Sequence, residues 1–120
     1  MSNMKVFYVR NDYKKRDITI VSDLQDLDGR KVIKFAWAFR SNHDTFIKKE
    51  GKALARIRLE QADVNYSSSF EVESPKFRVI CANILKTILS SQSTPRKYFD
   101  DIEFDIEYFE NDAYWRSSIQ

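Results

Sequence analysis

Residues 31–40 read Lys-Val-Ile-Lys-Phe-Ala-Trp-Ala-Phe-Arg, and Ser-Asn-His-Asp follows at 41–44, before the basic run Lys-Lys-Glu-Gly-Lys-Ala-Leu-Ala-Arg-Ile-Arg at 48–58. In the first stretch the odd positions are large and apolar, whereas the even positions are small or charged. This period of two predicts a strand with one bulky face against a core. The opposite face has two alanines between two cations, so it is open enough for something to lie against it.

The next segment changes to a helical pattern. Residues 41–44 supply turn and N-cap side chains, and residues 45–60 are expected to form a basic amphipathic helix. Gly51 costs about 1 kcal/mol relative to Ala inside a helix, so close backbone packing is expected there. The apolar stripe of this helix is predicted to consist of Phe46, Ile47, Ala53, Leu54 and Ile57.

The rest of the chain adds strands and one strong helix. Short strands are predicted at 4–9 and 17–22, with a polar connection between them. Another clear strand, with an acidic outer face, is predicted at 102–108. Asp28-Gly29 is a turn signal, and Ser74-Pro75 marks the start of a core helix. Residues 64–73 are ambiguous. The order favours an α+β fold, with an antiparallel sheet of four or five strands packed against two helices.

Bulk properties fit a small soluble protein. The 120 residues suit a single domain over 1–120, and 42% of them are hydrophobic. No apolar run approaches the roughly 18 residues of a membrane-spanning helix. One cysteine, Cys81, excludes an intramolecular disulfide. We therefore expect a cytoplasmic protein with no membrane partner.

Charge is strongly segregated along the chain. Residues 30–58 hold nine basic side chains against Asp44 and Glu50, whereas residues 100–112 hold seven acidic side chains and no basic one. One surface should therefore attract anions and another should repel them. The two regions could also meet, within one chain or between copies.

Specific catalytic signatures are absent from the sequence. His43 is the sole histidine, and it fits a solvated turn or a phosphate contact better than a catalytic base. Cys81 lies on the apolar face of the core helix and should be a small buried hydrophobe. The two glycines cannot form a phosphate-binding loop, and Cys and His ligand spacings are missing. The expectation is a protein that is not an enzyme and needs no metal or cofactor.

The basic helix and the strand before it are the best binding candidate. Their cations could pair with phosphate, although the same side chains could simply keep the helix soluble. The predicted ligand-binding residues are Lys34, Arg40, His43, Asp44, Lys48, Lys52, Arg56 and Arg58. Trp37, Tyr66 or Trp115 could stack on a base.

Residues 35–58, from Phe35-Ala36-Trp37 through Ser41-Asn42-His43-Asp44 to Arg56-Ile57-Arg58, resemble small bacteriophage accessory proteins. Within that set they are most similar to the Thoeris anti-defence proteins. The resemblance implies sequestration of a cyclic nucleotide signal without cleavage, and assembly as a homo-oligomer. It also implies that Asp44, with Arg56 or Arg58, faces the ligand.

Four hypotheses follow from these patterns, and a small hydrolase is the last of them. The leading one is a non-enzymatic phage-type protein that sequesters a small phosphate-bearing nucleotide signal. The second is an RNA- or DNA-binding inhibitor that uses the same basic face as an extended track. The third is a protein-interaction module that acts on a host protein through the acidic segment 102–108.

Overall fold

A computed structural model describes residues 3–11, 13–14, 16–40 and 48–111. Its elements are β1 (Asn3–Asn11), β2 (Arg16–Leu27), β3 (Arg30–Phe39), α1 (Lys48–Glu60), β4 (Ser67–Glu71), α2 (Phe77–Ser90), a 3-10 turn (Arg96–Tyr98) and α3 (Phe99–Glu110). The fold is therefore α+β. The chain forms two compact units, residues 1–73 and 74–120.

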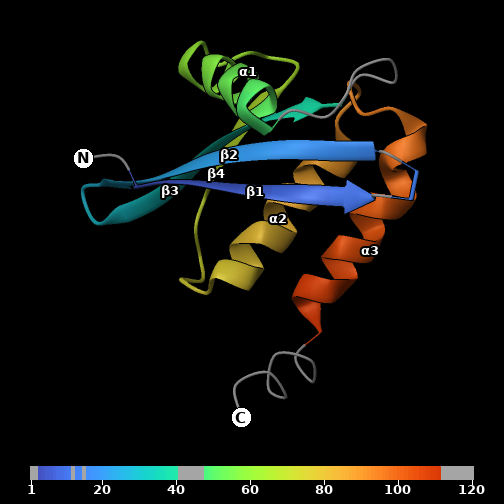
Figure 1. The fold of residues 1–120 in the computed structure, drawn as a ribbon. Coiled ribbons are helices and arrows are strands. Elements are labelled where there is room, and N and C mark those ends of the chain that lie inside the picture. Colours follow the sequence, from blue (N-terminus) through green and yellow to red (C-terminus); the bar gives the residue numbers. More distant parts are fainter. Residues whose placement is uncertain (1–2, 12, 15, 41–47, 112–120) are drawn as a thin grey trace. The chain divides into compact units, whose positions relative to one another are not determined.

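The first unit is a four-stranded antiparallel sheet with strand order β1-β2-β3-β4 (Figure 1). β1 pairs with β2 in the register Arg10↔Asp17, and β2 pairs with β3 from Ile18↔Phe39 to Leu27↔Arg30. The predicted turn is confirmed, because Asp28 and Gly29 have φ values of 55° and 85° in the two-residue connection. Two positive φ values match the right-handed twist of a tight hairpin.

α1 lies across the small-residue face of this sheet (Figure 1). Ala55 is fully buried with Val21 and Ala38, and Leu59 packs against the same cluster. A Cβ placed on Gly51 would lie 2.6 Å from the Thr19 hydroxyl oxygen, which confirms the expected close packing at this glycine. The alanine face of β3, which the sequence predicted to be open, is therefore covered by α1.

The predicted apolar stripe of α1 is wrong. Leu54 and Ile57 are 42% and 48% exposed, and Ala53 is exposed as well, whereas Phe46 and Ile47 lie outside the described residues. The helix turns its smallest side chains inward because a shallow sheet face built from alanines allows a close approach of backbones. Bulky side chains on that side would hold the helix away.

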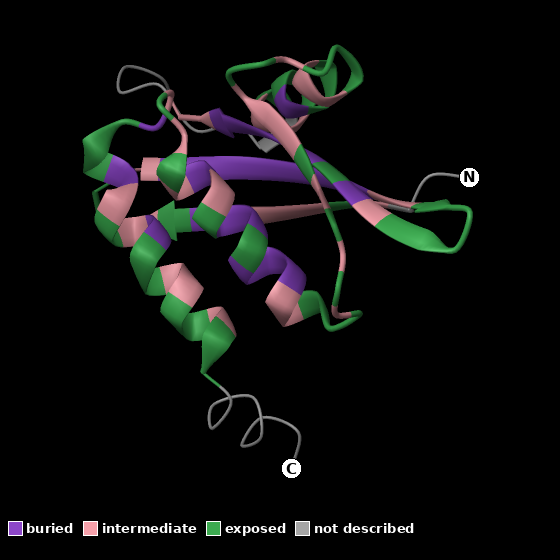
Figure 2. Cartoon of the chain, turned by 180° about the vertical axis from the view of Figure 1, so that it is seen from behind, coloured by how far each residue is buried: buried purple, intermediate pink, exposed green. Residues whose placement is uncertain are grey.

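The other face of the sheet holds the bulky residues of β3. Phe35 stacks on Trp37 at 5.8 Å between ring centroids and meets Phe70 of β4 edge to face at 5.6 Å. Ile18 and Ile20 of β2 are fully buried, and Figure 2 shows most of this strand as buried. β4 settles part of the ambiguous segment, since only Ser67–Glu71 of residues 64–73 forms a strand.

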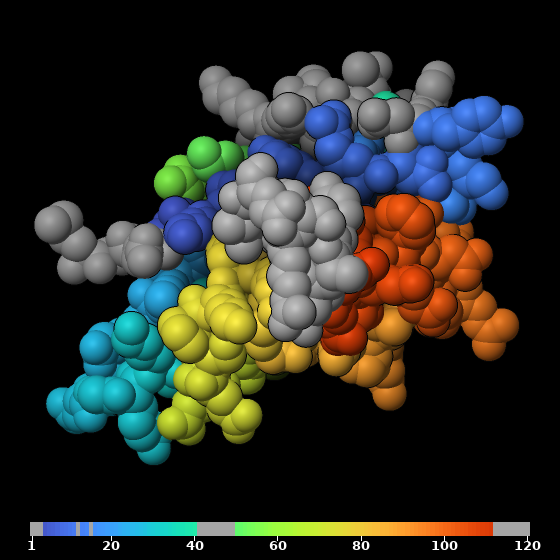
Figure 3. All heavy atoms as spheres, turned by 90° about the horizontal axis from the view of Figure 1, so that it is seen from below, coloured from blue at the N-terminus to red at the C-terminus, as the bar shows by residue number. Residues whose placement is uncertain are grey.

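The second unit is a pair of antiparallel helices. α2 buries Cys81 as expected, together with Ile84, Leu85 and Ile88. Its N-cap is Lys76, two residues beyond the predicted Ser74-Pro75 start. Arg78 in the first turn of α2 donates to the carbonyl of Phe109 in the last turn of α3, which fixes the antiparallel direction. Figure 3 shows the yellow and orange atoms of α2 beside the red atoms of α3.

The predicted strand at 102–108 is wrong, because these residues lie inside α3. Alternating apolar and acidic side chains concealed a second pattern, in which Tyr98, Ile102, Ile106 and Phe109 follow helical spacing. Tyr98 and Ile102 are 1% and 0% exposed, while Phe104 from the alternating set is 71% exposed. Asp100 and Asp101 in the first turn also favour the helix, since carboxylates stabilise the positive end of its dipole.

Candidate functional site

Those predicted ligand-binding residues that the structure describes do not gather around a cavity between β3 and α1. The space between these elements is filled by Thr19, Val21, Ala38 and Ala55, which are all at most 4% exposed. Lys34 is exposed near the middle of β3, and Lys52 is half-buried on α1. His43 and Asp44 lie outside the described residues, as does the side chain of Lys48.

The two arginines of α1 contact their own unit. Arg58 donates to the carbonyl of Trp37 at 2.8 Å, and its guanidinium carbon lies 3.9 Å from the centroid of the Tyr66 ring. Exposed Arg56 reaches the sulfur of Met4 at 3.4 Å. Arg58 therefore holds α1 to β3 and covers one face of Tyr66.

The proposed stacking residues are also largely occupied. Trp37 is 2% exposed, so its ring is closed to a base, and the prediction for it is wrong. Its indole Nε1 is buried without a hydrogen-bond partner among the described residues. Tyr66 has Arg58 on its ring, and Trp115 lies outside the described part of the chain.

One predicted residue, Arg40, belongs to a different cluster at the end of the sheet. It follows β3 directly, and its Nη1 donates to Oδ2 of Asp17 at 2.9 Å. From the other side, Nε of Arg10 in β1 lies 3.6 Å from Oδ1 of the same carboxylate. We call these three residues the arginine–aspartate cluster.

Strand register creates this cluster. Arg10 is the cross-strand partner of Asp17, and the backbone N–H of Arg40 donates to the carbonyl of Asp17 at 2.9 Å. The three side chains therefore leave the same face of three adjacent strands. Asp17 is 2% exposed, whereas the side chains of Arg40 and Arg10 are 16% and 42% exposed. The buried carboxylate thus orders two guanidinium groups that reach outward to different extents.

The surroundings add to the positive character of this end of the sheet. Gly51 of α1 lies over Thr19 of β2. Ala55, one helical turn later, packs against Val21, which is two residues further along β2. The first turn of α1 therefore lies toward Asp17, and this end of a helix carries the positive pole of its dipole. The guanidinium of Arg10 also lies 6.0 Å from the centre of the Tyr8 ring, which adds an aromatic surface.

Sequence reasoning missed Arg10, Asp17 and Tyr8. The first lies in a segment that was expected to be a hairpin connection, and β1 in fact continues to Asn11. An Asp at the start of an apolar strand is a weak signal. Without the register, nothing in the sequence pairs it with arginines seven residues before and 23 residues after it.

Two other features are absent from the described part of the chain. No set of three His, Cys, Asp or Glu side chains is arranged to hold a metal ion there. No described helix is both long and apolar enough to cross a membrane. Comparison of the chain with protein-family models, curated proteins and solved structures found no match.

Proposed function

We propose that this chain is a non-enzymatic binding protein that holds a phosphate-bearing nucleotide at the arginine–aspartate cluster. The observation that carries the proposal is the convergence of Arg10 and Arg40, from strands on either side of β2, on the single buried carboxylate of Asp17. Two guanidinium groups and one carboxylate leave one positive charge. Guanidinium groups also present paired N–H donors that match the geometry of phosphate oxygens.

Preorganisation supports the proposal. A long side chain that becomes ordered on binding costs about 0.5–1.5 kcal/mol of conformational freedom. Arg40 is already held by Asp17 through a hydrogen bond and is mostly buried, so little of this cost remains for it. Arg10 is the more accessible of the two, and the neighbouring Tyr8 ring offers a surface on which a base can stack.

Binding without turnover is part of the proposal. The thiol of Cys81 is fully buried in α2, so it is closed to a ligand as a nucleophile. The resemblance of residues 35–58 to Thoeris anti-defence proteins makes cyclic nucleotide signals the first ligands to test, with sequestration in a phage-infected cell as the proposed role.

The proposal is tested by titrating the full chain with cyclic ADP-ribose isomers and cyclic oligonucleotides, using calorimetry. Ligand released by heating the complex should be chemically intact when examined by chromatography. Arg10→Gln should weaken binding about tenfold or more, because a charge-assisted hydrogen bond contributes about 1.5–3 kcal/mol. Because the side chain of Arg10 is 42% exposed, the fold should tolerate this variant.

Arg30→Gln is the matched control. Arg30 is an exposed arginine of the same unit, and it lies at the opposite end of the sheet, where it pairs with Leu27. The control should bind like the unmodified chain. Equal weakening by both substitutions, with a steep loss of affinity for oligonucleotides at higher salt, would instead indicate an extended nucleic-acid track. Recovery of a cleaved ligand would show an enzyme.

A further inference from the structure

The outer surface of α3 leaves large aromatic side chains in solvent. Phe104 is 71% exposed and Tyr108, one helical turn later, is 38% exposed. Residues four apart lie on one face of a helix, so the two rings form a single apolar strip. An isolated exposed apolar residue is ordinary, but a strip beside hollowed surface is typical of a binding surface.

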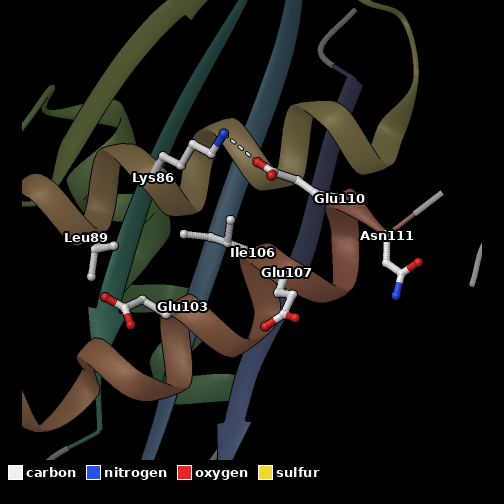
Figure 4. Close-up of a pocket in the computed structure, with 7 residues that line it drawn as sticks. All are labelled: Lys86, Leu89, Glu103, Ile106, Glu107, Glu110 and Asn111. Atoms are coloured by element: carbon white, nitrogen blue, oxygen red, sulfur yellow. Dashed lines mark ion pairs between the residues drawn. The ribbon is translucent and has the colours of Figure 1, made fainter. Parts of the chain in front are cut away.

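Two hollows flank α3. The larger has a volume of about 530 Å³ and lies between α2 and α3, with Leu89 and Ile106 among its lining residues (Figure 4). The smaller, of about 230 Å³, is lined by Phe104 and Tyr108 together with Glu107 and Asn111. Both hollows therefore combine apolar surface with carboxylates.

A row of three glutamates lines the larger hollow, and Glu107 also lines the smaller one. Glu103, Glu107 and Glu110 are spaced four and three residues apart, which places them along one line of the helix. Glu110 forms an ion pair with Lys86 of α2 at one end of the larger hollow (Figure 4). Glu103 and Glu107 form no salt bridge with any described residue, and both are exposed. Like charges at this spacing repel one another, and a cationic partner would relieve that repulsion.

We propose that this glutamate-lined groove of α3 docks a basic amphipathic helix of a partner protein. Apolar side chains of that helix would enter the two hollows and cover Phe104, while its lysines or arginines would pair with Glu103 and Glu107. From Glu103 to Glu110 there are seven residue steps, or about 10 Å at 1.5 Å per step, so about two turns of a partner helix match the length of the glutamate row. Recognition through apolar anchors at three- and four-residue spacing is the usual mode of a helix in a groove.

Charge complementarity identifies the occupant. Among the seven residues that line the larger hollow, the acidic ones are Glu103, Glu107 and Glu110, and the basic one, Lys86, is already paired. A cationic segment is therefore attracted and an acidic one repelled. This surface belongs to the second unit, so the proposal does not rest on the arginine–aspartate cluster of the first.

A direct test uses the full chain labelled with ¹⁵N and two synthetic helical peptides. One peptide carries leucines at three- and four-residue spacing with flanking lysines, and the other has glutamates in place of the lysines. The lysine peptide should give saturable shift changes at residues of α2 and α3 around the groove, and its affinity should fall with added salt because the attraction is screened. The glutamate peptide should not bind.

Variants of the groove sharpen the test. Phe104→Ala and the pair Glu103→Gln with Glu107→Gln should each weaken binding of the lysine peptide about tenfold, while Glu60→Gln, an exposed substitution on α1, should leave it unchanged. Equal binding of both peptides, or shift changes spread over the first unit, would overturn the proposal. So would concentration-dependent dimerisation of the unmodified chain that Phe104→Ala abolishes, since the occupant would then be a second copy.

Discussion

Gly51→Ala gives the sharpest stability test of how α1 meets the sheet. In an open helix the substitution should stabilise the protein by about 1 kcal/mol, because alanine has the higher helix propensity. Here the new methyl carbon would lie 2.6 Å from Oγ1 of Thr19, whose side chain is 1% exposed. Overpacking of this kind costs about 1–3 kcal/mol, so the net result should be a loss of about 1 kcal/mol.

Urea denaturation followed by circular dichroism measures this change directly. A loss of about 1 kcal/mol corresponds to a fall in Tm of about 3–5 °C for a chain of this size. Ala53→Gly, at an exposed position of α1, is the reference for helix propensity alone and should lose about 1 kcal/mol. Adding Thr19→Ala to Gly51→Ala should remove the clash and yield a favourable coupling free energy. If Gly51→Ala is as stable as the unmodified chain or more so, the close approach of α1 to β2 is refuted.

Three further substitutions test the cluster, α3 and α2. Asp17→Asn should lower the free energy of unfolding in urea by about 3 kcal/mol, because it removes a buried carboxylate that two arginines contact. Unchanged stability would show that the cluster does not stabilise the fold. Partial burial, and then the neighbouring charge of Asp101, raise the pKa of Asp105 from 3.8 to about 6. The contribution of Asp105 to stability is thus present below pH 3.8 and lost as the pH rises through about 6. Asp105→Asn should therefore raise Tm at about pH 7 but not at about pH 3.5. The gain in free energy of unfolding at the higher pH should be no more than about 1 kcal/mol, because the carboxyl is only partly buried. Leu85→Ala, at a fully buried position, should cost about 2–5 kcal/mol, whereas Leu54→Ala at 42% exposure should cost far less, and equal losses would contradict the burial pattern.

Local sequence patterns predicted the first three strands. Short runs rich in strand-forming residues indicated 4–9 and 17–22, and alternation of bulky with small or charged residues indicated 31–40. The bulky residues Ile33, Phe35 and Trp37 are buried on one face of β3, and the alanines of the other face are buried under α1. The Asp28-Gly29 turn connects β2 and β3 as predicted. The same logic failed at residues 102–108. Two of the alternating apolar residues, Ile102 and Ile106, are also four apart and so fit one face of a helix. The pattern of a helix becomes visible only when Tyr98 and Phe109, which lie outside the alternating run, are included.

The candidate site was less predictable than the fold for a different reason. Charge density along the sequence singled out residues 30–58, yet spatial pairing across strands decides which cations share a site. Arg40 was included for its place on the open face of the predicted strand 31–40, but Arg10 and Asp17 join it only through the register of β1 with β2. Arg58, by contrast, is basic and well placed in the sequence, and it is engaged with Trp37 and Tyr66.

The exposed glutamates of α3 and the buried carboxylate of Asp17 show how one kind of side chain can serve opposite purposes in the two units. Asp17 lies between two arginines and orders them, so its negative charge is compensated within the fold. Glu103 and Glu107 have no salt bridge to a described residue and face solvent beside exposed Phe104, so their charge remains available for long-range attraction. A ligand of the first unit should therefore be anionic and a partner of the second unit cationic. A single reagent cannot satisfy both surfaces, so separate titrations with nucleotide and basic peptide should show independent, additive binding.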